Sequence, residues 1–175
     1  MAVLPVRTFP DEILTTPARA ANPIDPAVQR LIRDLIDTMR HHPRCVGLAA
    51  PQVGAGLRVA VIDVSGHPKA KQSSGLMVLV NPEIVEREGM VVQREGCQSV
   101  PDLTGNVGRA ARVAVAAFDG SGTRWTAWCE GFEAIAVQHE VDHLAGKLFL
   151  DRVENSRTDV FRRKQYWFPE APPQR

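Results

Sequence analysis

The order of the secondary-structure patterns limits the folds open to this chain more than any other feature. Runs rich in Val, Ile and Leu, bounded by Gly, Ser, Pro and Asn, are typical of strands. They cover residues 57–64, 76–86, 113–118 and 123–129. One helical pattern precedes this block and another follows it. Because strands do not alternate with helices, the sequence predicts an α+β fold with mainly antiparallel sheets packed around a central helix.

The first helical pattern covers residues 26–41. Asp25 and Pro26 are typical of a helix start, with a capping side chain followed by proline at the first helical position. Apolar residues then recur at spacings of three and four: Val28, Leu31, Ile32, Leu35, Ile36 and Met39. Since Pro43 disfavours helical backbone at the residue before it, we expect the helix to end near residue 41.

The second helical pattern begins at Gly131 and ends at Gly146. It contains His139-Glu140-Val141-Asp142-His143, so the predicted central helix carries an H-E-x-x-H motif. Two histidines at this spacing differ by about 40° around a helix and can reach one metal ion. Glu140 lies beside such an ion, where a general base for a metal-bound water is needed. The alternative is a chance match on a surface helix, but the apolar surroundings favour metal binding.

A catalytic metal site of this kind needs a third protein ligand. The metzincin pattern would place it at Phe149, which cannot bind a metal. Glu154, close in sequence, and Glu170, in a proline-rich tail, are poor candidates for a thermolysin-like ligand. Cys97, which we expect on a glycine-flanked turn, would complete a Cys-His-His set as a thiolate. The alternative for Cys97 is a buried structural thiol, the role that we expect for the other two cysteines.

Composition narrows the class of protein. Lys and Arg total 21 against 20 Asp and Glu, and this net charge of +1 offers no basic surface that would hold nucleic acid non-specifically. No run approaches the roughly 18 consecutive apolar residues of a membrane helix. Residues 1–18 carry charges and prolines where a signal peptide would be apolar, and no transit peptide is seen. We therefore expect a cytoplasmic protein, with an organellar location as the alternative, and no membrane or specific nucleic-acid partner.

The remaining segments complete the predicted organisation. The 175 residues are expected to form one catalytic domain over 1–175. Residues 119–122 form a turn cluster consistent with a hairpin, and residues 101–108 are expected to be a loop. A C-terminal helix and tail are expected over about 153–175, with the helix itself from about 156 to 167.

Three motifs, taken together, resemble those of the peptide deformylase family. They are residues 45–54 (Cys-Val-Gly-Leu-Ala-Ala-Pro-Gln-Val-Gly), 95–99 (Glu-Gly-Cys-Gln-Ser) and 139–143 (His-Glu-Val-Asp-His). In the family these read G-x-G-x-A-A-x-Q, E-G-C-x-S and H-E-x-x-H, and the last two are complete here. The first begins with Cys45 where the family usually has glycine. The likeness extends from residue 26 to about residue 152.

The resemblance implies a hydrolase that removes the formyl group from the N-terminal formylmethionine of nascent polypeptides and releases formate. It implies one Fe²⁺ per chain, which Zn²⁺, Ni²⁺ or Co²⁺ can replace. The ligands carried over are Cys97, His139 and His143. Glu140 would activate the water, while the Gln52 side-chain amide and the Gln98 backbone N–H would hold the oxyanion.

The methionine side chain of such a substrate needs an apolar pocket. Helix geometry places three candidates for its walls on the side that the ligands face: Phe132, Ile135 and Ala136. Ordinary core packing is the alternative for them. The main chain at Val46 and Gly47 could pair with the substrate like an added strand. Glu95 and Arg109 stand where the family has a charged pair beside the ligands, which predicts a supporting role.

Two other functions stay open at this point. One is a metallopeptidase that uses the same Cys-His-His site, and the other is a non-catalytic descendant that binds nascent chains or ribosomes. The expected partners are N-formylmethionyl peptides and, in a transient contact, the ribosome. The candidate for that contact is a helix that carries Arg162, Arg163 and Lys164 together with Tyr166, Trp167 and Phe168. The alternative for this segment is a helix that closes the fold.

Overall fold

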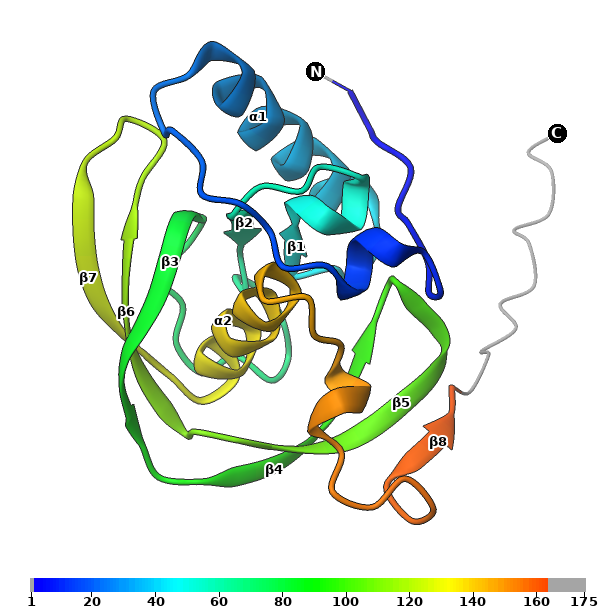
Figure 1. Cartoon of the computed structure of the whole chain (residues 1–175). Coiled ribbons are helices and arrows are strands. Elements are labelled where there is room, and N and C mark those ends of the chain that lie inside the picture. The colour runs from blue at the N-terminus through cyan, green and yellow to red at the C-terminus, as the bar shows by residue number, and fades with distance from the viewer. Residues whose placement is uncertain (1, 164–175) are drawn as a thin grey trace, which may run out of the picture.

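A computed structural model describes residues 2–163 of the chain (Figure 1). This part contains two α-helices, short 3-10 helices and eight strands. In order they are η1 (Glu12–Thr15), α1 (Pro26–His41), β1 (Gly47–Ala49), η2 (Ala50–Val53), β2 (Val59–Ile62), β3 (Met77–Glu88), β4 (Val91–Cys97), β5 (Val100–Arg109), β6 (Arg112–Phe118), β7 (Arg124–Glu130), α2 (Gly131–Leu144), η3 (Phe149–Arg152) and β8 (Val160–Arg162).

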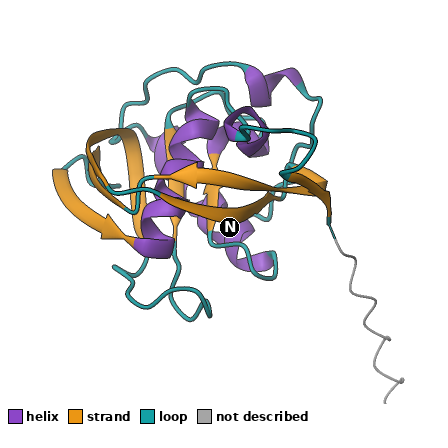
Figure 2. Ribbon diagram, turned by 90° about the horizontal axis from the view of Figure 1, so that it is seen from below, coloured by secondary structure: helices purple, strands orange, loops and turns teal. Residues whose placement is uncertain are grey.

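The strands form two sheets in which every named pair is antiparallel. The larger sheet has the order β1-β2-β3-β6-β7, and the smaller has the order β4-β5-β8. Figure 1 shows α2 in the middle of the molecule, with strands around it and α1 on the outside. Figure 2, which views the molecule from below, shows long strands passing in front of the helices. The predicted α+β class, with antiparallel sheets around a central helix, is confirmed.

The central helix is buried on almost every side. Ten of the fourteen residues of α2 are buried. On β2, Ala60 and Ile62 share an apolar cluster with α2, whereas Val59 and Val61 on the other face pack with α1. Each fully buried aliphatic side chain contributes about 1.5–3 kcal/mol. β2 is therefore packed between the two helices. This packing fixes the position of α2, so that the helix can present functional side chains in a defined place.

Both predicted helices are confirmed, and their ends have local causes. The Asp25 side chain accepts a hydrogen bond from the N–H of Ala27 at 2.7 Å, as an N-cap should. α2 ends two residues before Gly146, whose φ is +69°. A Cβ at this glycine would lie 2.8 Å from the carbonyl oxygen of Thr15, so the chain needs glycine there both for its backbone and for space.

The loop predicted over residues 101–108 is wrong, because this segment lies within β5. Its pairing with β4 runs from Val91 opposite Arg109 to Cys97 opposite Val100. Accordingly, Cys97 is the last residue of a strand, with a short turn after it, rather than part of a glycine-flanked turn. The glycines and polar residues of this segment interrupt the apolar pattern by which a strand is predicted. Gly105, for example, is needed because a Cβ there would lie 2.9 Å from Val153.

The helix predicted over about 156–167 is wrong for the residues that the structure describes. Residues 156–158 form a turn, and β8 then pairs with β5. Residues 164–167, including Lys164, lie outside the described part, and a single domain over 1–175 stays a prediction. No helix within residues 2–163 is long and apolar enough to cross a membrane.

Candidate metal centre and active site

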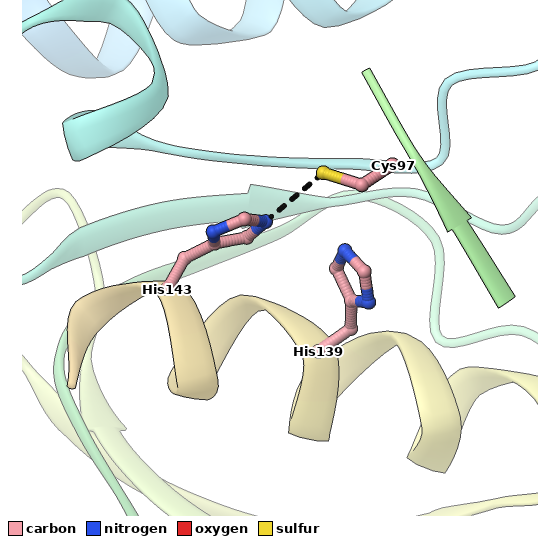
Figure 3. A group of neighbouring side chains, drawn as sticks. All are labelled: Cys97, His139 and His143. Atoms are coloured by element: carbon pink, nitrogen blue, oxygen red, sulfur yellow. Dashed lines mark hydrogen bonds between the residues drawn. The ribbon is translucent and has the colours of Figure 1, made fainter. Parts of the chain in front are cut away.

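The three predicted metal ligands come together in the structure. Cys97 ends β4, and His139 and His143 lie one turn apart on α2 (Figure 3). One ligand atom from each of them lies within 4.8 Å of the other two. The Sγ of Cys97 is 3.2 Å from the Nε2 of His143. Two imidazoles and a thiol around one point form a donor set that fits a divalent transition metal.

The surroundings of Cys97 favour its thiolate form. Burial by itself raises the pKa of the thiol, but His143 and His139 hold that pKa well below its ordinary value. The backbone N–H of Ser99 also points at the sulfur, at 3.4 Å. Because the thiolate is the form that binds metals, the surroundings of Cys97 favour its metal-binding form even without a metal.

A carboxylate orients His139. The Nδ1 of His139 is 2.8 Å from the Oε2 of Glu95, so an N–H at Nδ1 leaves Nε2 free to bind a metal. Glu95 is itself held by Arg109, with distances of 2.7 Å and 3.0 Å to the guanidinium. Although burial raises the pKa of Glu95, His139 and Arg109 bring it to about 2. The structure thus joins Glu95 and Arg109 beside the ligands, as the sequence predicts.

Sequence reasoning missed the rest of this ionic network. Asp142 on α2 accepts hydrogen bonds from Arg109 at 2.5 Å and from Arg152 at 2.6 Å and 3.0 Å. Asp142 is buried, whereas the Arg152 side chain is 42% exposed. An acidic residue next to the second histidine, on a helix expected to be buried, was the available signal, because a buried carboxylate requires a cationic partner. Its partners come from β5 and η3, so the pattern of the helix does not identify them.

Glu140 lies beside the ligands without a hydrogen-bond partner for one oxygen. Its Oε2 is buried and unpaired among the described residues. Its Oε1 packs so closely on β1 that a Cβ added to Gly47 would lie 2.5 Å away. Burial raises the pKa of Glu140 to about 7. The carboxylate is therefore placed to take up and give back a proton.

Gln52 is fixed at the same place by bonds to both of its amide atoms. Its Oε1 accepts from the N–H of Ala49 at 2.9 Å, and its Nε2 is 3.2 Å from the Oγ of Ser99 and 3.4 Å from the Sγ of Cys97. The side chain is 2% exposed. A buried N–H₂ group aimed at the metal ligands can donate to an oxygen that gains negative charge there.

A cavity of about 400 Å³ opens over these groups. Every residue predicted for substrate contact lines it: Val46, Gly47, Phe132, Ile135 and Ala136. Gln52, Gln98, Glu95 and Glu140 line it as well, together with Cys97 and His139. Arg109 and His143 are not among the lining residues. Sequence reasoning missed the lining residues from the loop after β2, His67 and Lys69, because nothing local in that loop indicates a pocket.

The other two cysteines are not ligands. The Sγ of Cys45 donates to the carbonyl oxygen of Gly47, and burial and Glu140 raise its pKa to about 12. Burial likewise raises the pKa of Cys129 to about 12. Arg44, just before the first motif, has a positive φ of +64°, whereas Cys45 does not have a positive φ. Cysteine in place of the usual glycine therefore causes no backbone strain at this position.

Comparison with known proteins agrees with this geometry. The family model described as Polypeptide deformylase matches residues 3–159. A peptide deformylase of Syntrophobacter fumaroxidans is 41% identical over 164 residues, 94% of each chain. A crystal structure of a peptide deformylase from Legionella pneumophila superposes with a TM-score of 0.79 at 42% identity, covering 87% of both chains. The Met-Ala-Ser bound structure of a class I type b peptide deformylase from Acinetobacter baumannii gives 0.80 at 36% identity, covering 87% of this chain and 99% of that one. The chain belongs to the peptide deformylase family.

Proposed function

We propose that this protein removes the formyl group from peptides that begin with N-formylmethionine and releases formate. One observation carries the proposal: the carboxylate of Glu140, whose Oε2 has no hydrogen-bond partner among the described residues, and the amide of Gln52 line the same cavity as the metal ligands Cys97 and His139. A base, an oxyanion donor and three metal ligands are the groups that hydrolysis of a formamide needs.

Three metal ligands set the chemistry of the centre. When bound, a divalent metal acts as a Lewis acid and makes water acidic enough to ionise near neutral pH. Cys97, His139 and His143 would hold it, and Glu95 would keep His139 in the tautomer that binds.

The protein side chains would move the protons. Glu140 takes a proton from the water whose oxygen attacks the formyl carbon. The Gln52 N–H₂ group and the Gln98 backbone N–H donate to the formyl oxygen as it gains negative charge. Glu140 then gives its proton to the departing nitrogen while the C–N bond breaks. Formate and a peptide with a free amino terminus result. The oxygen of the water ends in formate, and the proton that Glu140 carried ends on the amino nitrogen.

The substrate chain has a fitting place between the two sheets. β1 and β4 are the edge strands of their sheets, and residues of both line the cavity. An extended peptide can therefore pair with the main chain at Val46 and Gly47. Phe132, Ile135 and Ala136 offer apolar surface for the methionine side chain. The related deformylase from Acinetobacter baumannii binds Met-Ala-Ser, which is the product of such a reaction.

The test compares substrates. Formyl-Met-Ala-Ser should yield formate, and unformylated peptides should stay intact. Internal cleavage of unformylated peptides with formyl-peptides ignored would instead identify a metallopeptidase. Ribosome or nascent-chain binding without any formate release would identify a non-catalytic descendant. The cytoplasmic location and a transient ribosome contact through the segment around Arg162 and Arg163 stay predictions.

We further propose that the metal in the cell is Fe²⁺. The structure supports a divalent metal but does not select iron, because a thiolate and two imidazoles also suit Zn²⁺, Ni²⁺ and Co²⁺. The choice of iron rests on the resemblance to the family. Protein purified without oxygen is expected to contain about one iron per chain by elemental analysis. After removal of the iron, Ni²⁺, Co²⁺ or Zn²⁺ should restore formate release to different extents. A different metal in the anaerobic sample would contradict the assignment of iron.

A methyl group added at Gly47 tests the placement of the base. The new Cβ of Gly47→Ala would lie 2.5 Å from the Oε1 of Glu140, so the carboxylate must move. A displacement of about 1 Å costs up to roughly a hundredfold in rate, and we expect a tenfold to hundredfold lower kcat/KM. Gly56→Ala is the matched control, because nothing lies within 4 Å of its added Cβ. Equal activity of the two variants would show that Glu140 does not act from this position.

A further inference from the structure

The rim of the active-site cavity carries positive charge that the proposed reaction does not use. Four cationic side chains line the cavity: Arg44, Lys69, Arg94 and Arg163. The carboxylates among the described lining residues are Glu95 and Glu140, and both are buried. The whole chain has 21 basic and 20 acidic residues, so this excess is local. Positively charged side chains therefore gather at the cavity that a peptide substrate must enter.

One pair of these cations lies beside the pocket wall formed by Phe132. His67 stacks on the Phe132 ring with centroids 4.3 Å apart, and the Nζ of Lys69 lies 5.8 Å from the centroid of the same ring. Burial, followed by Lys69 and Arg44, lowers the pKa of His67. Lys69, from the loop after β2, therefore lies beside the pocket wall, and Arg44, from the loop before β1, lies close enough to act on the same histidine.

The other pair is held by the C-terminal strand. The Arg94 guanidinium lies 3.4 Å from the centroid of the Phe161 ring on β8. The Nη2 of Arg163 donates to the carbonyl oxygen of Cys97 at 3.1 Å and sits over Gly96, where an added Cβ would come within 2.5 Å of it. Because β8 pairs with β5, these contacts fix both guanidinium groups beside the exposed edge of β4.

None of the four cations forms an ion pair with a carboxylate within residues 2–163. Arg44, Lys69 and Arg94 are exposed, and Arg163 is partly buried. Unpaired cations on two sides of a cavity concentrate anionic groups there and speed their association. In the proposed reaction the formyl group lies at the metal ligands and methionine in the apolar pocket, so the residues that follow methionine would leave the cavity past these cations.

We propose that the rim selects formylmethionyl peptides that carry an acidic side chain in the two residues after methionine. The inference rests on the proposed function and adds a substrate preference to it. The anion is a side-chain carboxylate, since a chain still attached to the ribosome has no free carboxyl terminus. Exposed ion pairs are individually weak, so we expect a graded preference rather than an absolute requirement.

The experiment uses the metal-loaded protein and C-terminally amidated peptides, formyl-Met-X-Ala and formyl-Met-Ala-X, with X as Glu, Gln or Lys. At low salt we expect kcat/KM for Glu to exceed that for Gln roughly threefold to tenfold, mainly through a lower KM, and Lys to fall below Gln. At 1 M salt the Debye length is about 3 Å, so the difference should shrink toward unity.

Variants locate the effect. Arg44→Gln/Lys69→Gln and, separately, Arg94→Gln should each lower the Glu-to-Gln ratio. Arg163 is left unchanged because it also holds the Cys97 carbonyl. The matched control is Arg30→Gln/Arg33→Gln, which removes two exposed charges from α1 away from the cavity lining. The control should keep the ratio of the unchanged protein.

The outcomes separate the inference from the function on which it rests. Equal kcat/KM for Glu, Gln and Lys peptides at low salt overturns the preference and leaves the deformylase intact. A preference that survives in all rim variants, or that the control loses equally, also overturns it. If none of the formyl-peptides yields formate, the proposed function itself fails.

Discussion

Replacing Glu140 with alanine is expected to lower kcat/KM for formyl-Met-Ala-Ser by roughly 10²–10⁴-fold, the range of general acid–base catalysis. The carboxylate lies beside the metal ligands, one buried oxygen has no hydrogen-bond partner within residues 2–163, and burial raises its pKa to about 7. Alanine cannot exchange a proton at that point. The ligands Cys97, His139 and His143 are unchanged, so the variant should still contain one metal per chain by elemental analysis.

The control for this variant is Glu133→Gln, on the same helix. Glu133 is also a buried carboxylate, but it accepts hydrogen bonds from Ser74 at 2.7 Å and 3.0 Å and does not line the cavity. We expect its kcat/KM per metal-loaded chain to stay close to that of the unchanged protein. Normal turnover by Glu140→Ala with its metal in place would refute the assignment of the base.

Removing Arg109 is expected to have the largest effect on stability. Its side chain is 4% exposed and joins two buried carboxylates, Glu95 and Asp142. In Arg109→Leu both lose this cation, and breaking a buried ion pair in this way costs about 3–5 kcal/mol. For a chain of this size, that corresponds to a fall in Tm of roughly 6–20 °C, measurable by thermal unfolding of the metal-free proteins.

The same change should weaken the metal centre. Glu95 would lose the partner that orients it toward His139, and loss of such support typically reduces metal affinity by about 10–100-fold. Arg112→Leu is the control, since Arg112 is 39% exposed and its ion pairs with Glu88 and Glu130 lie at the surface. Exposed pairs contribute at most about 1 kcal/mol. Equal losses of Tm and metal affinity in both variants would contradict the role of the buried network.

Local signals predicted the two helices because both begin and end through their own residues. Asp25 caps α1, and Gly146 supplies the positive φ that follows α2. β5 was missed because its residues, with glycines and few branched side chains, form a strand only through pairing with β4 on one side and β8 on the other. Likewise, β8 is three residues long and has no pattern of its own.

The residues of the candidate site also fall into two groups, those that the sequence could predict and those that it could not. Cys97, His139 and His143 could be found from motifs, since the chemistry of the ligands fixes their types and the helix fixes part of their spacing. Arg152 could not, because its contact with Asp142 depends on how η3 packs against α2. The same holds for Arg163, which reaches the carbonyl of Cys97 only through the pairing of β8 with β5.

The most direct test of the account is an anaerobic titration of metal-free protein with Fe²⁺, followed by formate release from formyl-Met-Ala-Ser. Three ligands around one point predict no activity without metal, a linear rise to one equivalent and no further rise beyond it. Formate release by the metal-free protein, or none at one equivalent of bound metal, would contradict the claim that this cluster is the active centre.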